Sequence, residues 1–163
     1  EYYGRGPWGN YEDRKTSTFI DRYISPINEM VTKYVLPQEN AHHTDANWLA
    51  VTQRSGNGLL FVADDVFQFN VSNYLLETVS NGESLNNDAA VGDAPRNKHI
   101  NDYVPSDKVD LFIDFRMQGV GGNNSWGKLP LEEYLIRPAS TPVSYGFTII
   151  PIQNTKQINN FFN

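Results

Sequence analysis

The chain has 163 residues, a length that suits one domain with a hydrophobic core of its own. Hydrophobic residues make up 39% of it and aromatic residues 13%, which is too many for a disordered chain. The net charge of −6 argues against binding to nucleic acid or to an anionic membrane surface, and no run approaches the ~20 apolar residues of a membrane helix.

Glycine, proline and aromatic residues crowd the first thirteen positions, and we expect an irregular, turn-rich segment there. These aromatics need a surface to pack on, and we expect part of it upstream of Glu1, because a chain without an initial methionine suggests a mature product or an excised fragment. Residues 26–35 carry a helical stripe of apolar side chains that Pro37 would end. The pattern leaves a short helix and a non-helical segment equally open.

Strand patterns dominate the middle of the chain. Residues 48–53 and 59–63 flank the sequence Ser-Gly-Asn-Gly at 55–58, which predicts a hairpin. Further on, Phe67, Phe69 and Val71 alternate with polar residues. This period of two predicts a strand with one buried and one exposed face.

Two further strands are expected in the second half of the chain. Residues 109–117 form the clearest strand pattern, and residues 144–152 form another, in which Pro151 indicates an edge position or a strand end. Residues 81–107 are polar and rich in turn-forming types, which predicts a long surface loop. Because loops rather than crossover helices join the strands, the sequence predicts an all-β, antiparallel sandwich.

The sequence does not supply a complete catalytic or metal site. Asp110 and Asp114 share a strand face at a spacing of roughly 13 Å, wider than the ~5–9.5 Å between the carboxylates of glycosidases. The pair His42-His43 has no recognised ligand spacing, cysteine is absent, and we expect both imidazoles to be exposed in a loop. No Gly-x-Ser-x-Gly elbow is present. We therefore expect no catalytic residue and no metal ligand in this chain.

The most distinctive segment is the glycine-rich loop at residues 119–127, directly after the strongest strand. It lacks the Lys-Ser/Thr ending of a phosphate loop, and no helical pattern follows, which disfavours nucleotide binding. Its glycines permit close approach, its asparagines can fix the loop, and an indole can stack on a sugar ring. A tryptophan that only caps the core is the open alternative. The candidate residues are Trp126 for sugar contact, supported by Gly119, Gly121, Gly122, Asn123, Asn124 and Ser125.

Four motifs stand in a fixed order along the chain. They are Gly4-Arg5-Gly6-Pro7 with Asn10-Tyr11-Glu12-Asp13-Arg14, then Tyr34-Val35-Leu36-Pro37-Gln38-Glu39-Asn40, then Phe67-Gln68-Phe69-Asn70-Val71-Ser72-x-Tyr74, and Gly119-Val120-Gly121-Gly122-Asn123-Asn124-Ser125-Trp126. Together they resemble the C-terminal portion of the large LacZ-type β-galactosidases of glycoside hydrolase family 2. Trp8-Gly9 departs from the polar residue and glutamate that this family has before Asn10.

This resemblance implies that residues 1–163 are the C-terminal part of the last β-sandwich domain, with a galactose-mutarotase-like fold. The parent would be a retaining glycosidase that hydrolyses terminal β-D-galactosides such as lactose. Its catalytic glutamates and its magnesium and sodium sites would lie earlier in the parent, so the isolated chain should be inactive and hold no cofactor. Trp126 corresponds to the family tryptophan that lines the mouth of the active site and stacks on the sugar.

The resemblance also implies partners: a galactoside substrate, the remaining domains of the parent and, as an option, a second copy in a homo-oligomer. A bacterial cytoplasmic or periplasmic location stays open, as does the natural galactoside. Two other functions remain as alternatives. One is a self-standing carbohydrate-binding module with Trp126, Trp8 and Trp48 as platforms, and the other is a purely structural or oligomerisation domain.

Overall fold

The computed structural model describes residues 1–35, 40–74, 100–102, 104–122, 127–137 and 142–162. Strands dominate these ranges, and the helices are short. No helix in them is long and apolar enough to cross a membrane. The strands are β1 (Tyr2–Gly6), β2 (Phe19–Tyr23), β3 (His43–Thr52), β4 (Gly58–Ser72), β5 (Asp110–Asp114) and β6 (Phe147–Ile152). The helices are α1 (Ile27–Met30) and the 3-10 turns η1 (Ile100–Asp102), η2 (Glu132–Tyr134) and η3 (Thr155–Asn160).

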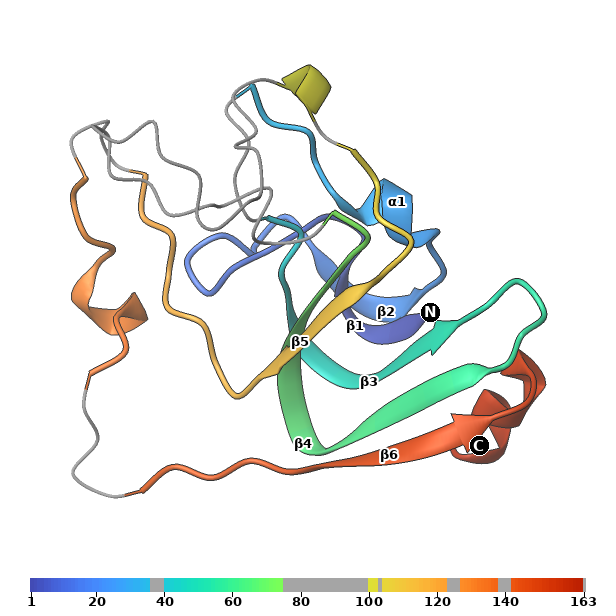
Figure 1. The fold of residues 1–163 in the computed structure, drawn as a ribbon. Helices are drawn as coiled ribbons and strands as arrows, with labels where there is room; N and C mark the ends of the chain where they lie inside the picture. The colour runs from blue at the N-terminus through green and yellow to red at the C-terminus, as the bar shows by residue number, and fades with distance from the viewer. Residues whose placement is uncertain (36–39, 75–99, 103, 123–126, 138–141, 163) are drawn as a thin grey trace.

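All strand pairs are antiparallel, and the strands form one sheet in the order β2-β1-β3-β4-β5, with β6 also paired to β4. The fifteen-residue strand β4 turns sharply in its middle (Figure 1). Its first part, residues 58–63, pairs with β6, and its last part, residues 68–72, pairs with β5. The sheet therefore curls over itself, and the fold is the all-β, sandwich-like domain that the sequence predicts.

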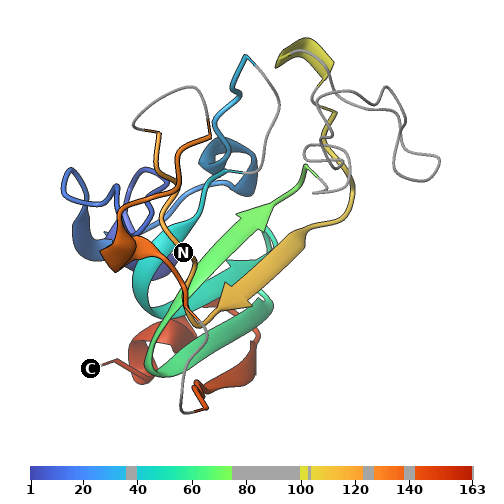
Figure 2. The same ribbon diagram turned by 90° about the vertical axis from the view of Figure 1, so that its left-hand side faces the viewer.

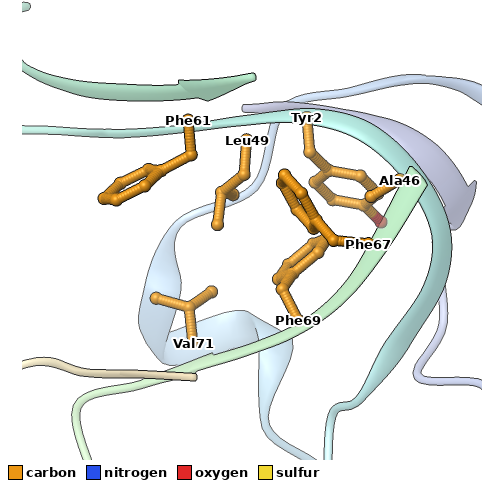
Figure 3. Packing of buried hydrophobic residues seen from close by; sticks show 7 residues of the cluster. All are labelled: Tyr2, Ala46, Leu49, Phe61, Phe67, Phe69 and Val71. Atoms are coloured by element: carbon orange, nitrogen blue, oxygen red, sulfur yellow. The ribbon is translucent and has the colours of Figure 1, made fainter. Parts of the chain in front are cut away.

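The main core fills the inside of this curl. In Figure 3 the side chains of Leu49 and Phe61 point toward those of Phe69 and Val71 from the other part of the curled sheet. All four side chains are at most 6% exposed, and burial of each such side chain stabilises the fold by about 1.5–3 kcal/mol. The two apolar residues at the ends of α1 pack against this core. The sheet is therefore fixed by both its backbone pairing and its core.

Several predicted elements are confirmed. β3 and β4 form the predicted hairpin, with Trp48 opposite Val62 and a left-handed Gly56 (φ 91°) in the turn. Strand β6 pairs only with β4 among the described strands, in agreement with the edge position that Pro151 indicates. Strand β5 ends at residue 114, three residues before the predicted end. Most of the predicted loop at 81–107 lies outside the described residues.

The start of the chain differs from the prediction, because residues 2–6 form a strand instead of an irregular segment. Tyr2 is 1% exposed, and an ideal Cβ on Gly4 would lie 2.9 Å from the Cα of Ala46 on the neighbouring strand. Glycine is therefore needed here for close strand packing, whereas its presence in the sequence suggests a turn. The ambiguous segment at 26–35 contains the single helical turn α1.

Two predictions about polar side chains are wrong. His42 and His43 are each 1% exposed rather than lying in an exposed loop, and His43 belongs to β3. The side chains of Gln68 and Asn70 are also buried, at 5% and 6% exposure, so this part of β4 has no exposed face. Strand alternation shows which residues share a face, but it does not show that neighbouring segments supply hydrogen-bond partners to the polar face.

Candidate functional site

A tight turn near the N-terminus points the carboxylate of Asp13 toward the glycine-rich loop. Tyr11 and Arg14 exchange backbone hydrogen bonds of 3.3 and 2.8 Å, which leaves Glu12 and Asp13 at the tip of the turn. The ring of Tyr11 stacks on the imidazole of His42, with ring centroids 5.6 Å apart and planes 17° apart. These contacts fix the turn against the chain segment that enters β3.

The buried Asn10 side chain fixes the base of the same turn. Its amide nitrogen donates hydrogen bonds to the carbonyl oxygens of Arg5 (2.9 Å) and Trp8 (3.0 Å). Its oxygen accepts from both the hydroxyl (2.7 Å) and the backbone N–H (3.0 Å) of Thr44. Because these four bonds satisfy the whole amide, a buried asparagine is stable here and holds the turn next to β3.

Asp13 holds the beginning of the glycine-rich loop. Its two carboxylate oxygens accept hydrogen bonds from the backbone N–H groups of Val120 (3.0 Å) and Gly121 (2.7 Å). The preceding N–H, that of Gly119, donates to the carbonyl oxygen of Tyr134 (2.8 Å). Figure 2 shows the blue N-terminal segment beside the orange segments that follow β5. Three consecutive backbone amides of the loop are therefore fixed by distant parts of the chain.

The glycines of the loop are needed for different physical reasons. An ideal Cβ on Gly119 would lie 2.6 Å from the Asp13 carboxylate and 2.8 Å from the Cβ of Tyr134, so no side chain fits there. Gly121 and Gly122 have φ values of 69° and 90°, which side chains rarely adopt. An ideal Cβ on Gly121 would be 3.3 Å from the Lys128 carbonyl oxygen, so the two ends of the loop run side by side.

Gln68 ties the strand before the loop to the N-terminal turn. Its side-chain oxygen accepts hydrogen bonds from the N–H of Met117 (2.7 Å) and from Nε2 of His42 (2.8 Å), and its amide nitrogen donates to Glu12. Burial lowers the pKa of His42, although the bond to Gln68 opposes this effect. Burial therefore favours the neutral form of this imidazole. We call Glu12, Asp13, His42 and Gln68 the loop support.

Lys15 and Arg5 form ion pairs with the carboxylates of Glu12 and Asp45. Lys15 lies 3.2 Å from Glu12 and 3.3 Å from Asp45, and Arg5 forms an ion pair of 2.7 Å with Asp45. Burial acts to raise the pKa of Asp45, but the hydrogen bond from Arg5 and the charge of Lys15 outweigh it and hold this pKa below its usual value. Lys15 thereby links Glu12 of the turn at 11–14 to Asp45 in β3.

Gly119, Gly121 and Gly122 lie in the described first part of the loop, and their role in supporting a sugar contact stays a prediction. Asn123, Asn124, Ser125 and Trp126 lie outside the described residues, so the sugar contact of Trp126 stays a prediction. The loop support itself was not predicted from the sequence. Its only signals were the acidic pair inside the Asn-Tyr-Glu-Asp-Arg motif and the polar residue between two phenylalanines of β4.

Within the described ranges, no group of three or more histidines and carboxylates could hold a metal ion. These residues therefore do not fit the magnesium or sodium site implied for the parent, and we derive no step through either ion. What the arrangement does is hold three consecutive backbone amides at the start of the loop.

Comparisons with known proteins agree with the order of the motifs. A family model described as "Beta galactosidase small chain" matches residues 1–149. A β-galactosidase of Vibrio cholerae serotype O1 is 33% identical over 135 residues, which cover 83% of this chain and 11% of that protein. A β-galactosidase of Priestia megaterium is 29% identical over 154 residues, 93% of this chain and 13% of that protein. The chain spans about a tenth of the length of these relatives. It belongs to the β-galactosidase small-chain family.

Proposed function

We propose that this chain is the C-terminal β-sandwich part of a retaining β-galactosidase that hydrolyses terminal β-D-galactosides such as lactose. In this proposal it contributes the aromatic loop with Trp126 to the sugar site. The catalytic glutamates and the magnesium and sodium ions belong to other domains of the parent. The observation that carries the proposal is the loop support, which holds the family's glycine signature by its backbone amides.

The fixed loop base supports a binding role for Trp126. A side chain that stacks on a sugar contributes affinity only if its position costs little entropy to maintain. Asp13, Tyr134 and Gln68 restrain backbone amides between residues 117 and 121, and Gly121 lies close to Lys128 and Pro130. The role of this chain is then to orient the sugar by stacking, worth about 0.5–1.5 kcal/mol, whereas the glutamates of the parent carry out the bond cleavage.

The test is kinetic, in the full polypeptide that carries this sequence. Trp126→Ala should raise KM for lactose about 2- to 10-fold, as the loss of one aromatic stack predicts, and change kcat much less. The ratio of transfer to hydrolysis should also change, because the stacked sugar is the acceptor. Trp8→Ala is the matched control, since Trp8 is 72% exposed and lies outside the loop. An unchanged KM and transfer ratio in Trp126→Ala would reject the stacking role.

Assay of the isolated chain independently tests whether the catalytic residues lie in other domains of the parent. We expect it to be inactive toward a chromogenic β-galactoside, because we place both catalytic glutamates elsewhere in the parent. Robust turnover by this chain alone, retained after rigorous purification from the host enzyme, would contradict the proposal.

One observation favours a structural role as a second function. The edge strand β2 and its end expose Phe19 (72%), Ile20 (47%) and Ile24 (78%), an unusual number of large apolar side chains for one short strand. Such a strand suits packing against another part of the parent or a second copy. Sizing chromatography of the chain tests this function: self-association that Phe19→Ser with Ile24→Ser abolishes supports it, and a monomer at high concentration rejects it.

The idea of a self-standing carbohydrate-binding module is weakened by one of its platforms. Trp48 is only 3% exposed, so its indole does not offer a free face to a ligand. Trp8 is 72% exposed, but a single exposed indole is a weak sugar site.

A further inference from the structure

A pocket whose described lining residues are all separate from the loop support opens beside β3 and β4. It has a volume of about 630 Å³ and lies at the corner where β4 turns between its pairing with β6 and its pairing with β5 (Figure 1). Trp48 and Val62, which pair across β3 and β4, line it. None of its described lining residues belongs to the described part of the glycine-rich loop. We call it the corner pocket.

Aromatic rings form one side of the corner pocket. The indole of Trp48 is held between the guanidinium of Arg22, 5.6 Å from the ring centroid, and the ring of Phe162, at 5.2 Å and nearly parallel. These two contacts fix the indole of Trp48 at the bottom of the corner pocket. Tyr3 and Phe162 border the same pocket and are 39% and 42% exposed, so these two rings offer the accessible faces on which a ligand can stack.

A bulge in β4 supplies the polar side. Between the pairs Ala46–Phe67 and Trp48–Val62, β3 has only Asn47, whereas β4 has residues 63–66. The extra residues are left out of the pairing between β3 and β4, and two of them, Asp64 and Asp65, line the pocket. Asn47 stabilises this bulge, because its amide nitrogen donates to the carbonyl oxygen of Asp65 (3.0 Å). Bulges of this kind redirect side chains and are frequent beside binding sites.

The charges around the corner pocket indicate which ligand it fits. Arg22, the one cation among the described lining residues, already forms an ion pair with the Glu1 carboxylate and donates to the side-chain oxygen of Asn159 (2.7 Å). The carboxylates of Asp64 and Asp65 accept no hydrogen bond from the described residues. Two free acceptors and a neutralised cation disfavour an anion such as phosphate, and the described part of the chain groups no third carboxylate or histidine there for a metal ion.

We propose that the corner pocket binds a neutral sugar, of one or two rings, as a second carbohydrate site. Carboxylates and side-chain amides bind sugar hydroxyl groups, and the exposed faces of Tyr3 and Phe162 suit the apolar C–H face of a pyranose ring. This combination of free acceptors and accessible aromatic faces is what distinguishes a sugar site from an apolar groove. The site goes beyond the proposed function and does not depend on Trp126.

The test uses the full polypeptide that carries this sequence, with methyl β-D-thiogalactoside as a probe that resists hydrolysis. Backbone hydrogen–deuterium exchange, resolved by peptide, should show saturable protection in the segments 43–52 and 58–66. Phe162→Ala should raise the half-saturating concentration for this protection about 2- to 10-fold, and Asp65→Ala should raise it as well. Both side chains are exposed enough for the fold to survive, and unchanged exchange of residues 67–72 verifies this.

Two control variants distinguish binding in the corner pocket from binding elsewhere on the protein. Phe19→Ala removes an equally large aromatic ring that lies outside the pocket, and it should leave the protection unchanged. Trp126→Ala should also leave it unchanged, even if the kinetic test of the proposed function fails. Absence of protection at 43–52 and 58–66, equal protection in Phe162→Ala and Asp65→Ala, or protection by inorganic phosphate in place of the sugar would each overturn the assignment.

Discussion

Replacement of Asp13 by alanine tests whether this one carboxylate orders the glycine-rich loop. Asp13→Ala removes two hydrogen bonds, to the N–H groups of Val120 and Gly121. Each hydrogen bond to a charged group contributes about 1.5–3 kcal/mol, and the partial exposure of Asp13 favours the low end. The local free energy of opening should therefore fall by about 3 kcal/mol. Since 1.4 kcal/mol corresponds to a factor of ten, the two amides should exchange with solvent about 100-fold faster.

The measurement is hydrogen–deuterium exchange of the peptide that contains residues 117–122, in the full polypeptide. Asp13→Asn should have an intermediate effect, because the amide keeps one acceptor oxygen and turns its NH₂ group toward the other N–H. We expect an effect near 10-fold for this variant. Asp21→Ala, which removes an exposed carboxylate from β2, is the matched control and should leave the exchange of this peptide unchanged.

The same variants link the loop to the proposed activity. If Trp126 binds the sugar, a loosened loop base should raise KM for lactose most in Asp13→Ala and less in Asp13→Asn, with a smaller effect on kcat. Equal exchange rates at residues 117–122 in Asp13→Ala and wild type would refute the role of Asp13. Faster exchange with unchanged KM would keep that role and reject the function of the loop.

Three further predictions concern stability. Gly119→Ala should lower the free energy of unfolding by about 1–3 kcal/mol, because its Cβ would collide with Asp13 and Tyr134; a urea unfolding curve measures this. Gln68→Leu should cost about 3 kcal/mol in the same assay, since three buried or partly buried groups lose their partner. Burial lowers the pKa of His43 to about 4 in the folded protein, whereas its pKa in the unfolded chain is ~6.5. As pH falls from about 6.5 to 4, the imidazole is therefore protonated in the unfolded state before it is protonated in the folded state. Stability should decrease across this window by up to about 3 kcal/mol, and unfolding curves of His43→Phe should lack that part of the decrease.

The first two of these predictions each have a control variant. Val120→Ala shortens an exposed side chain beside Gly119 and should change stability by less than ~0.5 kcal/mol. Gln53→Leu replaces an exposed glutamine in the turn between β3 and β4, and it should be equally mild. For His43, a stability profile that is flat between about pH 6.5 and 4 in the wild type would contradict the burial of a neutral imidazole.

The sequence was sufficient to predict elements whose signals are local. The turn at 55–58 and the apolar alternation at 67–71 depend on backbone preference and period, and both were found where predicted. β1 was missed because Gly4 allows close contact with Ala46, about forty positions away in β3, which no local pattern reports. The burial of His42 was missed for the same reason. Its hydrogen-bond partner is on β4 and its stacking partner is in the N-terminal turn.

The family signature could be recognised from the sequence, but its physical meaning required the structure. Asn10 and Asp13 stand three residues apart, yet they perform different tasks, since one fixes the turn to β3 and the other holds the loop amides. The acidic turn at 11–14 and the glycines at 119–122 are about a hundred positions apart. A pattern search treats them as separate motifs, whereas the hydrogen bonds make them one unit.

The contact between the acidic turn at 11–14 and the glycines at 119–122 explains why the loop requires both. Gly119 leaves space for the Asp13 carboxylate, and the carboxylate in turn satisfies the next two backbone amides. A side chain at 119 would displace Asp13, and loss of Asp13 would leave Val120 and Gly121 without their acceptor. The two positions are therefore coupled: Gly119→Ala and Asp13→Ala together should destabilise the loop by less than the sum of their separate effects. Additive effects in this double-mutant cycle would mean that the turn and the glycines act independently, and that contacts outside this unit order the loop.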